Sequence, residues 1–283
     1  MTYEWLFSFA VFAEKCNFTH AAVQLHISQP ALHVQIKKLT EQVGLPLYLR
    51  SGRTLRLTPE GERLAAFARS VQEEEALVLA RLRGETYSGP VVLAAGQGAF
   101  LYLLGPAVKA FPKKRWPLRL LNLRGPEAIE SLRQGKAHLA VAVLNAAPEG
   151  LESTRLRDVG QHLLMKSSHR LARRRKLSPA DLAGEDLVLA PAGSPHRLMV
   201  EQAMRSEGIA PEVAVEASGW ELMMDFVSKG MGVAIVNDFC SVPRGLTAVP
   251  MRGFPLATYY LLARKTSNEG VSHLHERILH HAS

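Results

Sequence analysis

The sequence predicts three parts in order: an all-α N-terminal domain over residues 1–58, a long helix with a hinge over 59–90, and a C-terminal α/β domain over 91–283. Short helical stripes of apolar residues fill the first part, and one unbroken helical stretch fills the second. In the third part, short apolar runs alternate with helical stretches. A chain of 283 residues is long enough for several compact units, so each part has room for a core.

The composition is that of an ordinary globular protein in water, because 47% of the residues are hydrophobic and 21% are charged. No apolar run approaches the roughly 18 residues of a membrane span, and no secretory signal pattern opens the chain. The two cysteines, Cys16 and Cys240, form no CxxC pair, so neither a disulfide scaffold nor a cysteine zinc site is expected. We expect a cytoplasmic protein.

The net charge of +8 favours a polyanionic partner. Most of the basic excess lies beyond residue 90, so charge alone does not mark the N-terminal part as a nucleic-acid binder. The local pattern of residues has to decide that question.

The first 58 residues read as three short helices and a hairpin. An apolar stripe over residues 6–13 predicts the first helix. Thr19 is placed to cap a second helix over 20–25, and Ser28 a third with Pro30 in its first turn. A turn then precedes residues 55–57, whose alternation predicts one arm of a small hairpin.

The stretch from Pro59 to about Arg83 predicts one helix of roughly 35 Å. Its apolar residues follow a heptad seam with a single polar break, so the helix is expected to pair with another helix or with a second copy of itself. Packing of this helix on its own domain is the alternative. Residues 84–90 follow as a hinge. The seam consists of Leu64, Ala68, Val71, Glu75, Val78 and Leu82.

The third part predicts an α/β fold with largely parallel sheets. Strands are expected at 91–95, 118–123, 139–144, 163–166, 187–189, 213–217, 233–236 and 259–263. Helices are expected at 101–111, 126–133, 196–207, 219–228 and 272–280.

The spacing of residues 18–39 is that of a helix-turn-helix, in which polar residues at the start of the second helix reach base edges and lysines contact phosphates. Several motifs in one order make residues 6–61 resemble the winged helix-turn-helix of bacterial LysR-type transcriptional regulators. These motifs are Ala21-Ala22, Leu25 to Ala31 (LHISQPA), Ile36 to Leu39 (IKKL), Gly44 to Tyr48 (GLPLY), and Arg50 with Leu57 to Gly61 (LTPEG).

Downstream the resemblance continues more weakly, for example at Leu132 to Gly135 (LRQG) and Val227 to Ile235 (VSKGMGVAI). It implies a dimerising linker helix and an effector domain similar to type 2 periplasmic binding proteins. One lobe is then expected at about 91–160 with 265–283, and the other at about 161–264. The chain departs from the family pattern at His33-Val34 and at Thr40. It also departs at position 138, where it has His and the family pattern commonly has Asp.

The resemblance implies double-stranded operator DNA as partner, a homodimer that pairs into a tetramer, and a small effector that modulates promoter binding. RNA polymerase is a candidate further partner. Gln29 is the expected base reader, since its amide can pair with adenine, although Ser28 can serve as an N-cap alone. The expected DNA contacts are Thr19, Ser28, Gln29, Pro30, Ala31, His33, Lys37, Lys38, Arg50, Arg53 and Arg56.

The effector is expected between the lobes, where strand ends meet helix N-termini. Exposed amides and Arg124 favour an anionic ligand, and Phe100 with Trp220 favours an aromatic one, unless Arg124 is only a surface ion-pair residue. The candidate contacts are Gln97, Gly98, Ala99, Phe100, Arg124, Gly125, Asn145, Ala192, Ser194, Trp220 and Asn237.

Other classes of function fit less well. No nucleophile elbow, metal spacing or complete phosphate loop is present in the sequence, so we expect neither an enzyme nor a bound cofactor or metal. A transport-binding protein would explain the lobes but leaves the first 90 residues without a role.

Overall fold

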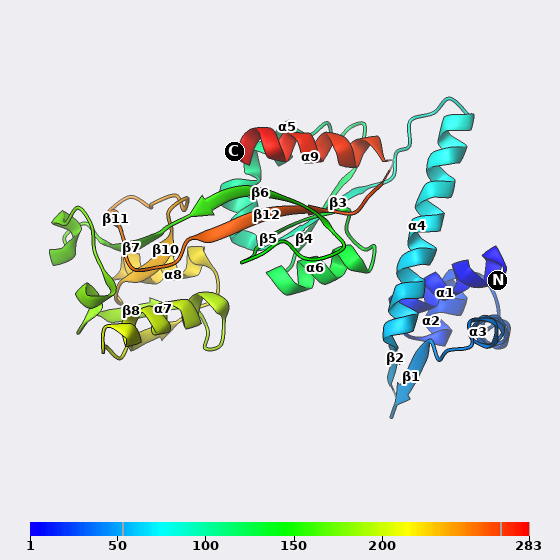
Figure 1. The fold of residues 1–283 in the computed structure, drawn as a ribbon, viewed down its shortest axis with the longest axis horizontal. Coiled ribbons are helices and arrows are strands. Elements are labelled where there is room, and N and C mark those ends of the chain that lie inside the picture. The colour runs from blue at the N-terminus through cyan, green and yellow to red at the C-terminus, as the bar shows by residue number, and fades with distance from the viewer. Residues whose placement is uncertain (53, 267, 283) are drawn as a thin grey trace.

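The computed structural model describes every residue except 53, 267 and 283. The molecule is elongated, with the N-terminal head at one end, a first lobe in the middle and a second lobe at the other end (Figure 1). The head and the long helix α4 stand beside the first lobe. None of the described helices is long and apolar enough to cross a membrane.

The head packs its three helices around aromatic and aliphatic side chains, with Phe9, Phe12, Leu32 and Ile36 fully buried. The side chain of Ser28 accepts from the amide of Ala31 and caps the third helix, as the sequence predicts. The predicted cap of the second helix is wrong: Asn17 accepts from the His20 amide, and Thr19 lies inside the first turn. The helices are α1 (Tyr3–Lys15), α2 (Phe18–Gln24) and α3 (Gln29–Val43).

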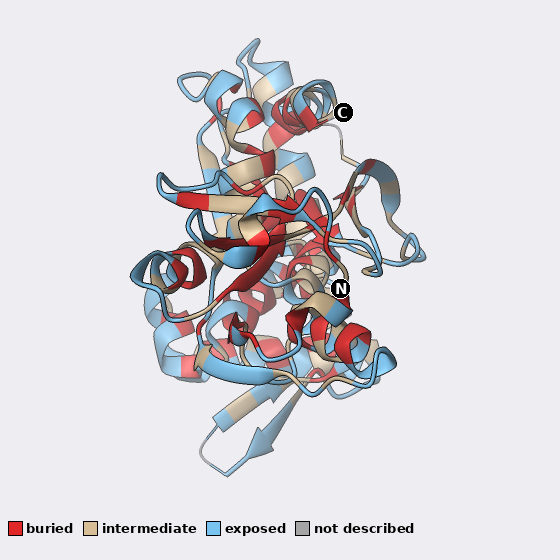
Figure 2. Ribbon diagram, turned by 90° about the vertical axis from the view of Figure 1, so that its left-hand side faces the viewer, coloured by how far each residue is buried: buried red, intermediate tan, exposed pale blue. Residues whose placement is uncertain are grey.

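The predicted hairpin forms between β1 (Tyr48–Ser51) and β2 (Thr54–Leu57), which pair antiparallel and project from the head as an exposed wing (Figure 2). After the wing, the Thr58 hydroxyl donates to the carbonyl of Pro46 and accepts from the amide of Gly61. A Cβ at Gly61 would lie 1.9 Å from the backbone oxygen of Leu47, so only glycine allows this close approach.

Helix α4 (Pro59–Leu82) begins and ends within one residue of the predicted bounds. The first half of its seam packs in cis, where Leu64, Ala68 and Val71 meet Leu6 and Ala10 of α1. The second half of the seam is open, although Leu77 beside it is buried. Val78 is 42% and Leu82 is 79% exposed.

The first lobe is a five-stranded sheet in the order β4-β3-β5-β12-β6, with α5 and α9 on one face and α6 on the other (Figure 1). Its strands are β3 (Val91–Ala95), β4 (Leu118–Asn122), β5 (Leu139–Val143), β6 (Glu152–Val159) and β12 (Ala257–Ala263). Its helices are η1 (Ala99–Leu103), α5 (Gly105–Ala110), α6 (Gly125–Arg133) and α9 (Glu269–Ala282).

The second lobe joins a three-stranded sheet, β10-β7-β11, to the parallel pair β8-β9. Its strands are β7 (Gln161–Lys166), β8 (Asp186–Leu189), β9 (Glu212–Glu216), β10 (Ala234–Asn237) and β11 (Leu246–Pro250). Its helices are η2 (Arg170–Arg173), η3 (Pro179–Leu182), α7 (Pro195–Ser206) and α8 (Trp220–Lys229).

Two expectations about the sheets are wrong. The sheets are mixed rather than largely parallel, because β7 and β12 each pair antiparallel with both of their neighbours. Residues 257–263, expected in the second lobe, form β12 between β5 and β6 and so belong to the first lobe. Antiparallel pairing lets the chain return directly across the waist without a crossover helix.

A polar cluster docks α4 onto the first lobe. The carboxylate of Glu73 accepts from Nε2 of His138 at 3.2 Å and from Nδ2 of Asn268 at 3.1 Å, and it lies 3.6 Å from the Arg264 guanidinium. Burial by itself raises the pKa of Glu73, but these hydrogen bonds and charges outweigh it and hold the pKa below its ordinary value. One turn earlier, Arg69 Nε donates to the Gln134 carbonyl at 2.9 Å.

Candidate DNA-binding surface and effector cleft

The start of α3 presents the polar residues expected to reach DNA. Ser28, Gln29 and Pro30 are exposed, and Ala31 is half-buried. The Thr19 hydroxyl donates to the side-chain oxygen of Gln29 at 3.1 Å. This bond fixes the Gln29 amide at the edge of the helix, where its NH₂ group keeps its donors for a base edge.

His33 is exposed but ordered by the core beneath it. Its ring stacks on Phe18, with centroids 3.6 Å apart and an interplanar angle of 16°. The stacked ring covers Phe18 and leaves its edge toward solvent. Val34 is 51% exposed on the same helix, off the face formed by Leu32, Ile36 and Leu39. Sequence reasoning did not include it among the expected DNA contacts.

The basic residues of the head are exposed and loosely held. Lys37 lies 3.8 Å from Glu41, and Lys38 lies over the Trp5 ring at 5.5 Å. In the wing, Arg50 Nε donates to the carbonyl of Gly52 at 3.2 Å. Such solvated cations can turn to phosphates at little cost.

The two remaining arginines of the wing are Arg56 and Arg53. Arg56 is exposed, and it also lines a cavity beside α4. Arg53 lies outside the described residues.

A carboxylate of the second lobe bridges the two lobes. Glu221, in the first turn of α8, accepts from the Tyr102 hydroxyl at 2.7 Å and from Nε2 of Gln97 at 3.2 Å. Burial and the neighbouring Glu221 charge raise the pKa of Tyr102, so its hydroxyl stays protonated and donates. The polar group at this junction between the lobes is therefore acidic.

Aromatic and small residues surround this bridge. Gly98 faces Trp220, where a Cβ would come within 2.6 Å of the indole nitrogen. The His196 ring meets Trp220 edge-on at 4.7 Å. Both of its nitrogens are buried without a hydrogen-bond partner in the described part of the chain. Burial lowers the pKa of His196 to about 4, so the ring is neutral and keeps one donor and one acceptor to offer.

A second network lies where the chain crosses between lobes. Nε2 of Gln161 donates to Asn237, and Nδ2 of Asn237 donates to the Tyr259 hydroxyl at 3.1 Å. Asp238 accepts from the amide of Gly160 at 2.8 Å. Asn237, a predicted effector residue, is thus buried and engaged in joining the lobes.

The other predicted effector residues spread away from the bridge. Ala99 is buried in the first lobe's core, with Phe100 packed against it. Arg124 forms a surface ion pair with Glu127 at 2.8 Å, and its side chain is 85% exposed. Asn145 and Ala192 are exposed, Gly125 is half-buried against β5, and Ser194 accepts from Arg197 as the N-cap of α7.

The structure also shows contacts that sequence reasoning did not assign to the cleft, namely those of Tyr102, Gln161 and His196. Among the residues that the structure describes, no three His, Cys, Asp or Glu side chains gather as a metal site would require.

A head that presents the start of a helix and a wing, joined to two bridged lobes, defines a DNA-binding protein that carries a ligand-binding module. The family models agree with this class: the LysR substrate binding domain matches residues 84–283, and the bacterial regulatory helix-turn-helix of the lysR family matches residues 3–62. The chain belongs to the LysR family of transcriptional regulators.

Individual relatives support the same assignment. The regulator CbbR of Xanthobacter flavus is 30% identical over 271 residues, covering 90% of this chain and 79% of that protein. The dual regulator OxyR of Escherichia coli is 29% identical, covering 79% and 75%.

Solved structures share the fold. A cysteine variant of full-length OxyR from Pseudomonas aeruginosa has a TM-score of 0.76 at 23% identity, covering 98% of this chain and 94% of that one. ArgP from Mycobacterium tuberculosis also has a TM-score of 0.76, at 17% identity, covering 99% and 96%.

Proposed function

We propose that this regulator acts in the cytoplasm as a homodimer, paired into a tetramer, and reads a promoter operator through the start of α3. The observation that carries the proposal is the exposed edge of Ser28 and Gln29, held by Thr19 above a fully packed helix-turn-helix core. Gln29 contacts a base edge, supported by Pro30, Ala31 and His33. Lys37, Lys38, Arg50, Arg53 and Arg56 contact phosphates.

Dimerisation uses the open half of α4. Val78 and Leu82 lie at heptad spacing and are exposed in the single chain. Apolar residues in this arrangement are typical of a helix that pairs with a second helix. Pairing there carries two heads onto half-sites about one helical turn apart. RNA polymerase is the further partner, because a regulator bound at such a site either recruits it or excludes it.

The effector binds between the lobes against Gln97, Gly98, Trp220 and Glu221. Glu221 supplies an acceptor and Trp220 a flat apolar surface, whereas Arg124 is paired elsewhere. We therefore favour an effector with an ammonium or guanidinium donor over the anionic ligand that the sequence indicates. A donor of this kind binds the Glu221 carboxylate in place of Tyr102 and Gln97. The loss of these two bonds between the lobes then lets the lobes shift relative to each other.

The DNA half of the proposal is tested by fluorescence anisotropy with intergenic DNA next to the gene and with a random-sequence selection. Gln29→Ala is expected to weaken specific binding by roughly 5- to 100-fold while leaving weak non-specific binding in place. Gln24→Ala, on the exposed side of α2, is the matched control. Failure to select any sequence would overturn the proposal.

The effector half is tested by calorimetry with cationic, neutral and anionic small molecules. Glu221→Gln is expected to remove binding of the cationic ligand, and Glu207→Gln, an exposed carboxylate on the same lobe, is expected to leave it unchanged. A ligand that is anionic and binds Glu221→Gln more tightly than the wild type would refute the assignment of charge.

A further inference from the structure

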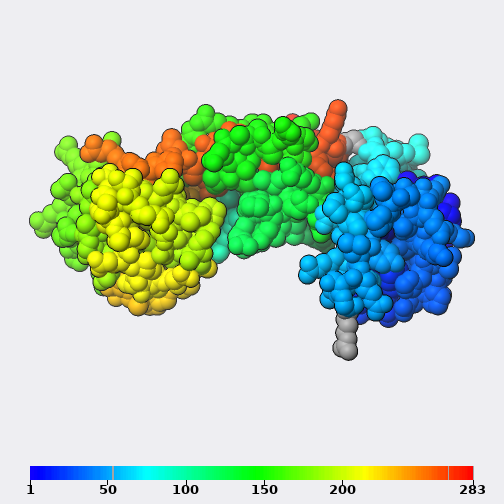
Figure 3. Space-filling model, turned by 60° about the horizontal axis from the view of Figure 1, so that its bottom comes forward, coloured from blue at the N-terminus to red at the C-terminus, as the bar shows by residue number. Residues whose placement is uncertain are grey.

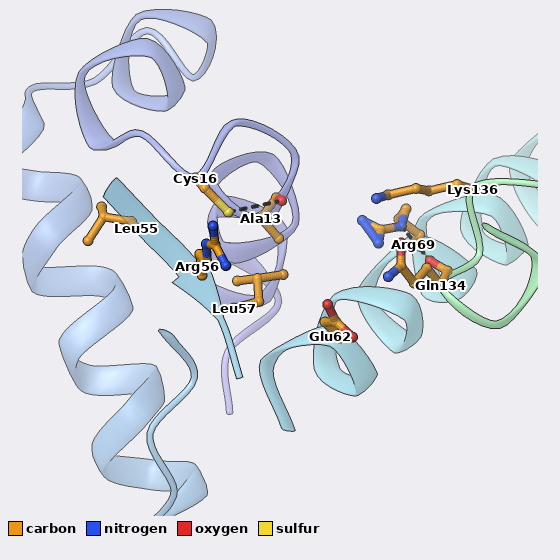
Figure 4. Close-up of a pocket in the computed structure, with 9 residues that line it drawn as sticks. All are labelled: Ala13, Cys16, Leu55, Arg56, Leu57, Glu62, Arg69, Gln134 and Lys136. Carbon is orange, nitrogen blue, oxygen red and sulfur yellow. Dashed lines mark hydrogen bonds between the residues drawn. The ribbon is translucent and has the colours of Figure 1, made fainter. Parts of the chain in front are cut away.

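A separate cavity of about 290 Å³ lies where the head, α4 and the first lobe meet (Figures 3 and 4). None of its lining residues is among the candidate effector contacts between the lobes. The end of α1, the strand β2, the first half of α4 and the turn after α6 each contribute. Its lining residues are Ala13, Cys16, Leu55, Arg56, Leu57, Glu62, Arg69, Gln134 and Lys136.

The cavity carries an excess of positive charge. Arg56 from the wing, Arg69 from α4 and Lys136 from the first lobe line it, against one carboxylate, that of Glu62. Figure 4 shows the charged ends of Arg69 and Lys136 pointing the same way, toward the strand that carries Arg56. Three cations from three different parts of the chain thus line one space.

Arg69 is the side chain with unmet hydrogen-bonding capacity. Its Nε donates to the Gln134 carbonyl, but Nη1 is buried and has no partner among the described residues. Burial lowers the pKa of Arg69, the charge of Arg264 lowers it further, and Glu14 offsets only part of this. A buried guanidinium nitrogen without an acceptor is costly, and a turn of the Arg69 side chain toward the cavity would let a bound anion supply one.

We propose that this cavity binds a small multivalent oxyanion of the phosphate type, held by Arg69, Lys136 and Arg56. A guanidinium presents parallel N–H groups that match two oxygens of such an anion, and the lysine adds a compact point charge. The volume leaves room for a small polyanion such as pyrophosphate. Because the three cations come from the wing, the linker helix and the first lobe, the bound anion joins the DNA-binding head to the effector domain.

The test is isothermal titration of the full-length protein with inorganic pyrophosphate in a low-salt buffer free of other phosphate. We expect saturable binding at one site per chain, weakened about tenfold or more in Arg69→Gln and in Lys136→Gln. Arg133→Gln, an exposed cation at the end of α6 that does not line the cavity, is the matched control and is expected to change the affinity less than about twofold. If circular dichroism shows that Arg69→Gln is unfolded, the pyrophosphate affinity of Lys136→Gln alone decides whether the cavity is the binding site.

Two outcomes overturn the proposal. One is no binding of pyrophosphate by the wild type, or binding that both cavity variants leave unchanged. The other is binding that Lys37→Gln weakens, with the cavity variants unaffected, which would place the anion on the DNA-binding surface. Hydrogen exchange provides the second readout: pyrophosphate should slow exchange both in residues 55–62 and in residues 134–136, and protection of only one segment would refute the joining role.

Discussion

Replacing Glu73 by Ala should undock the linker helix from the first lobe and destabilise that lobe. The variant leaves the Nε2–H of His138 and the Nδ2–H of Asn268 without their acceptor and removes the partner of Arg264. A hydrogen bond to a charged group contributes about 1.5–3 kcal/mol. The buried carboxylate also loses its desolvation cost when it is removed, so we expect a net loss of about 2–3 kcal/mol.

Calorimetry of the full chain measures this loss as a fall of about 4–12 °C in the melting temperature of the transition that includes the first lobe. Glu85→Ala, an exposed carboxylate just past the end of α4, is the control and should shift that transition by no more than about 0.5 kcal/mol. The difference should also depend on pH. Because the pKa of Glu73 is lowered on folding, its contribution is present above the ordinary value of 4.5 and is lost as the pH falls through the folded value.

The result that would refute this reasoning is equal stability of Glu73→Ala and Glu85→Ala at neutral pH. A difference that persists unchanged below the folded pKa of Glu73 would equally contradict it, because a protonated carboxyl no longer offers the charge on which the estimate rests.

Three further predictions concern single side chains. Burial lowers the pKa of His196 from 6.5 to about 4, so the buried ring imposes no protonation cost on folding above pH 6.5. As the pH drops to 4 the fold should lose up to about 3 kcal/mol, and thermal melts of His196→Phe should lack this slope. Gly61→Ala should cost about 1–3 kcal/mol in urea unfolding because its Cβ meets the Leu47 oxygen, whereas Gly105→Ala, with 3.6 Å to its neighbour, should cost less than about 1 kcal/mol. Burial raises the pKa of the Cys240 thiol to about 12, so peroxide should leave operator binding unchanged; a peroxide response that Cys240→Ser abolishes would contradict this.

Local signals in the sequence were enough to predict the head and the linker helix. Ser28 and Pro30 define the start of α3, and Thr58 with Pro59 defines the start of α4, because caps and helix-start prolines act over one turn. The cap of α2 was misassigned because Asn17 and Thr19 both have side chains that commonly cap helices. They lie only two positions apart, so residue type alone does not distinguish them. The strand β12 was misplaced because its neighbours β5 and β6 lie more than 90 residues away along the chain.

The site was less predictable for the same physical reason. The first-turn position of Glu221 is a local property of the sequence, but its bonds to Tyr102 and Gln97 span 119 and 124 residues. Arg124 occupies the expected position after a strand, yet Glu127, only three residues on, neutralises it. A pattern of residue types predicts where a polar group emerges from the fold and does not predict which partner it meets.

His138 shows what such a distant pairing adds. An ionised Asp at this position could only accept hydrogen bonds. Here Nδ1 of His138 accepts from the Val92 amide at 2.9 Å, and the His138 amide donates back to the Val92 carbonyl at 2.9 Å. With Nδ1 occupied as an acceptor, the ring hydrogen is on Nε2, and it points at Glu73. An aspartate would face Glu73 with a second negative charge, so His138 and Glu73 are a matched pair. Through them, the sheet of the effector domain holds the helix that carries the DNA-binding head.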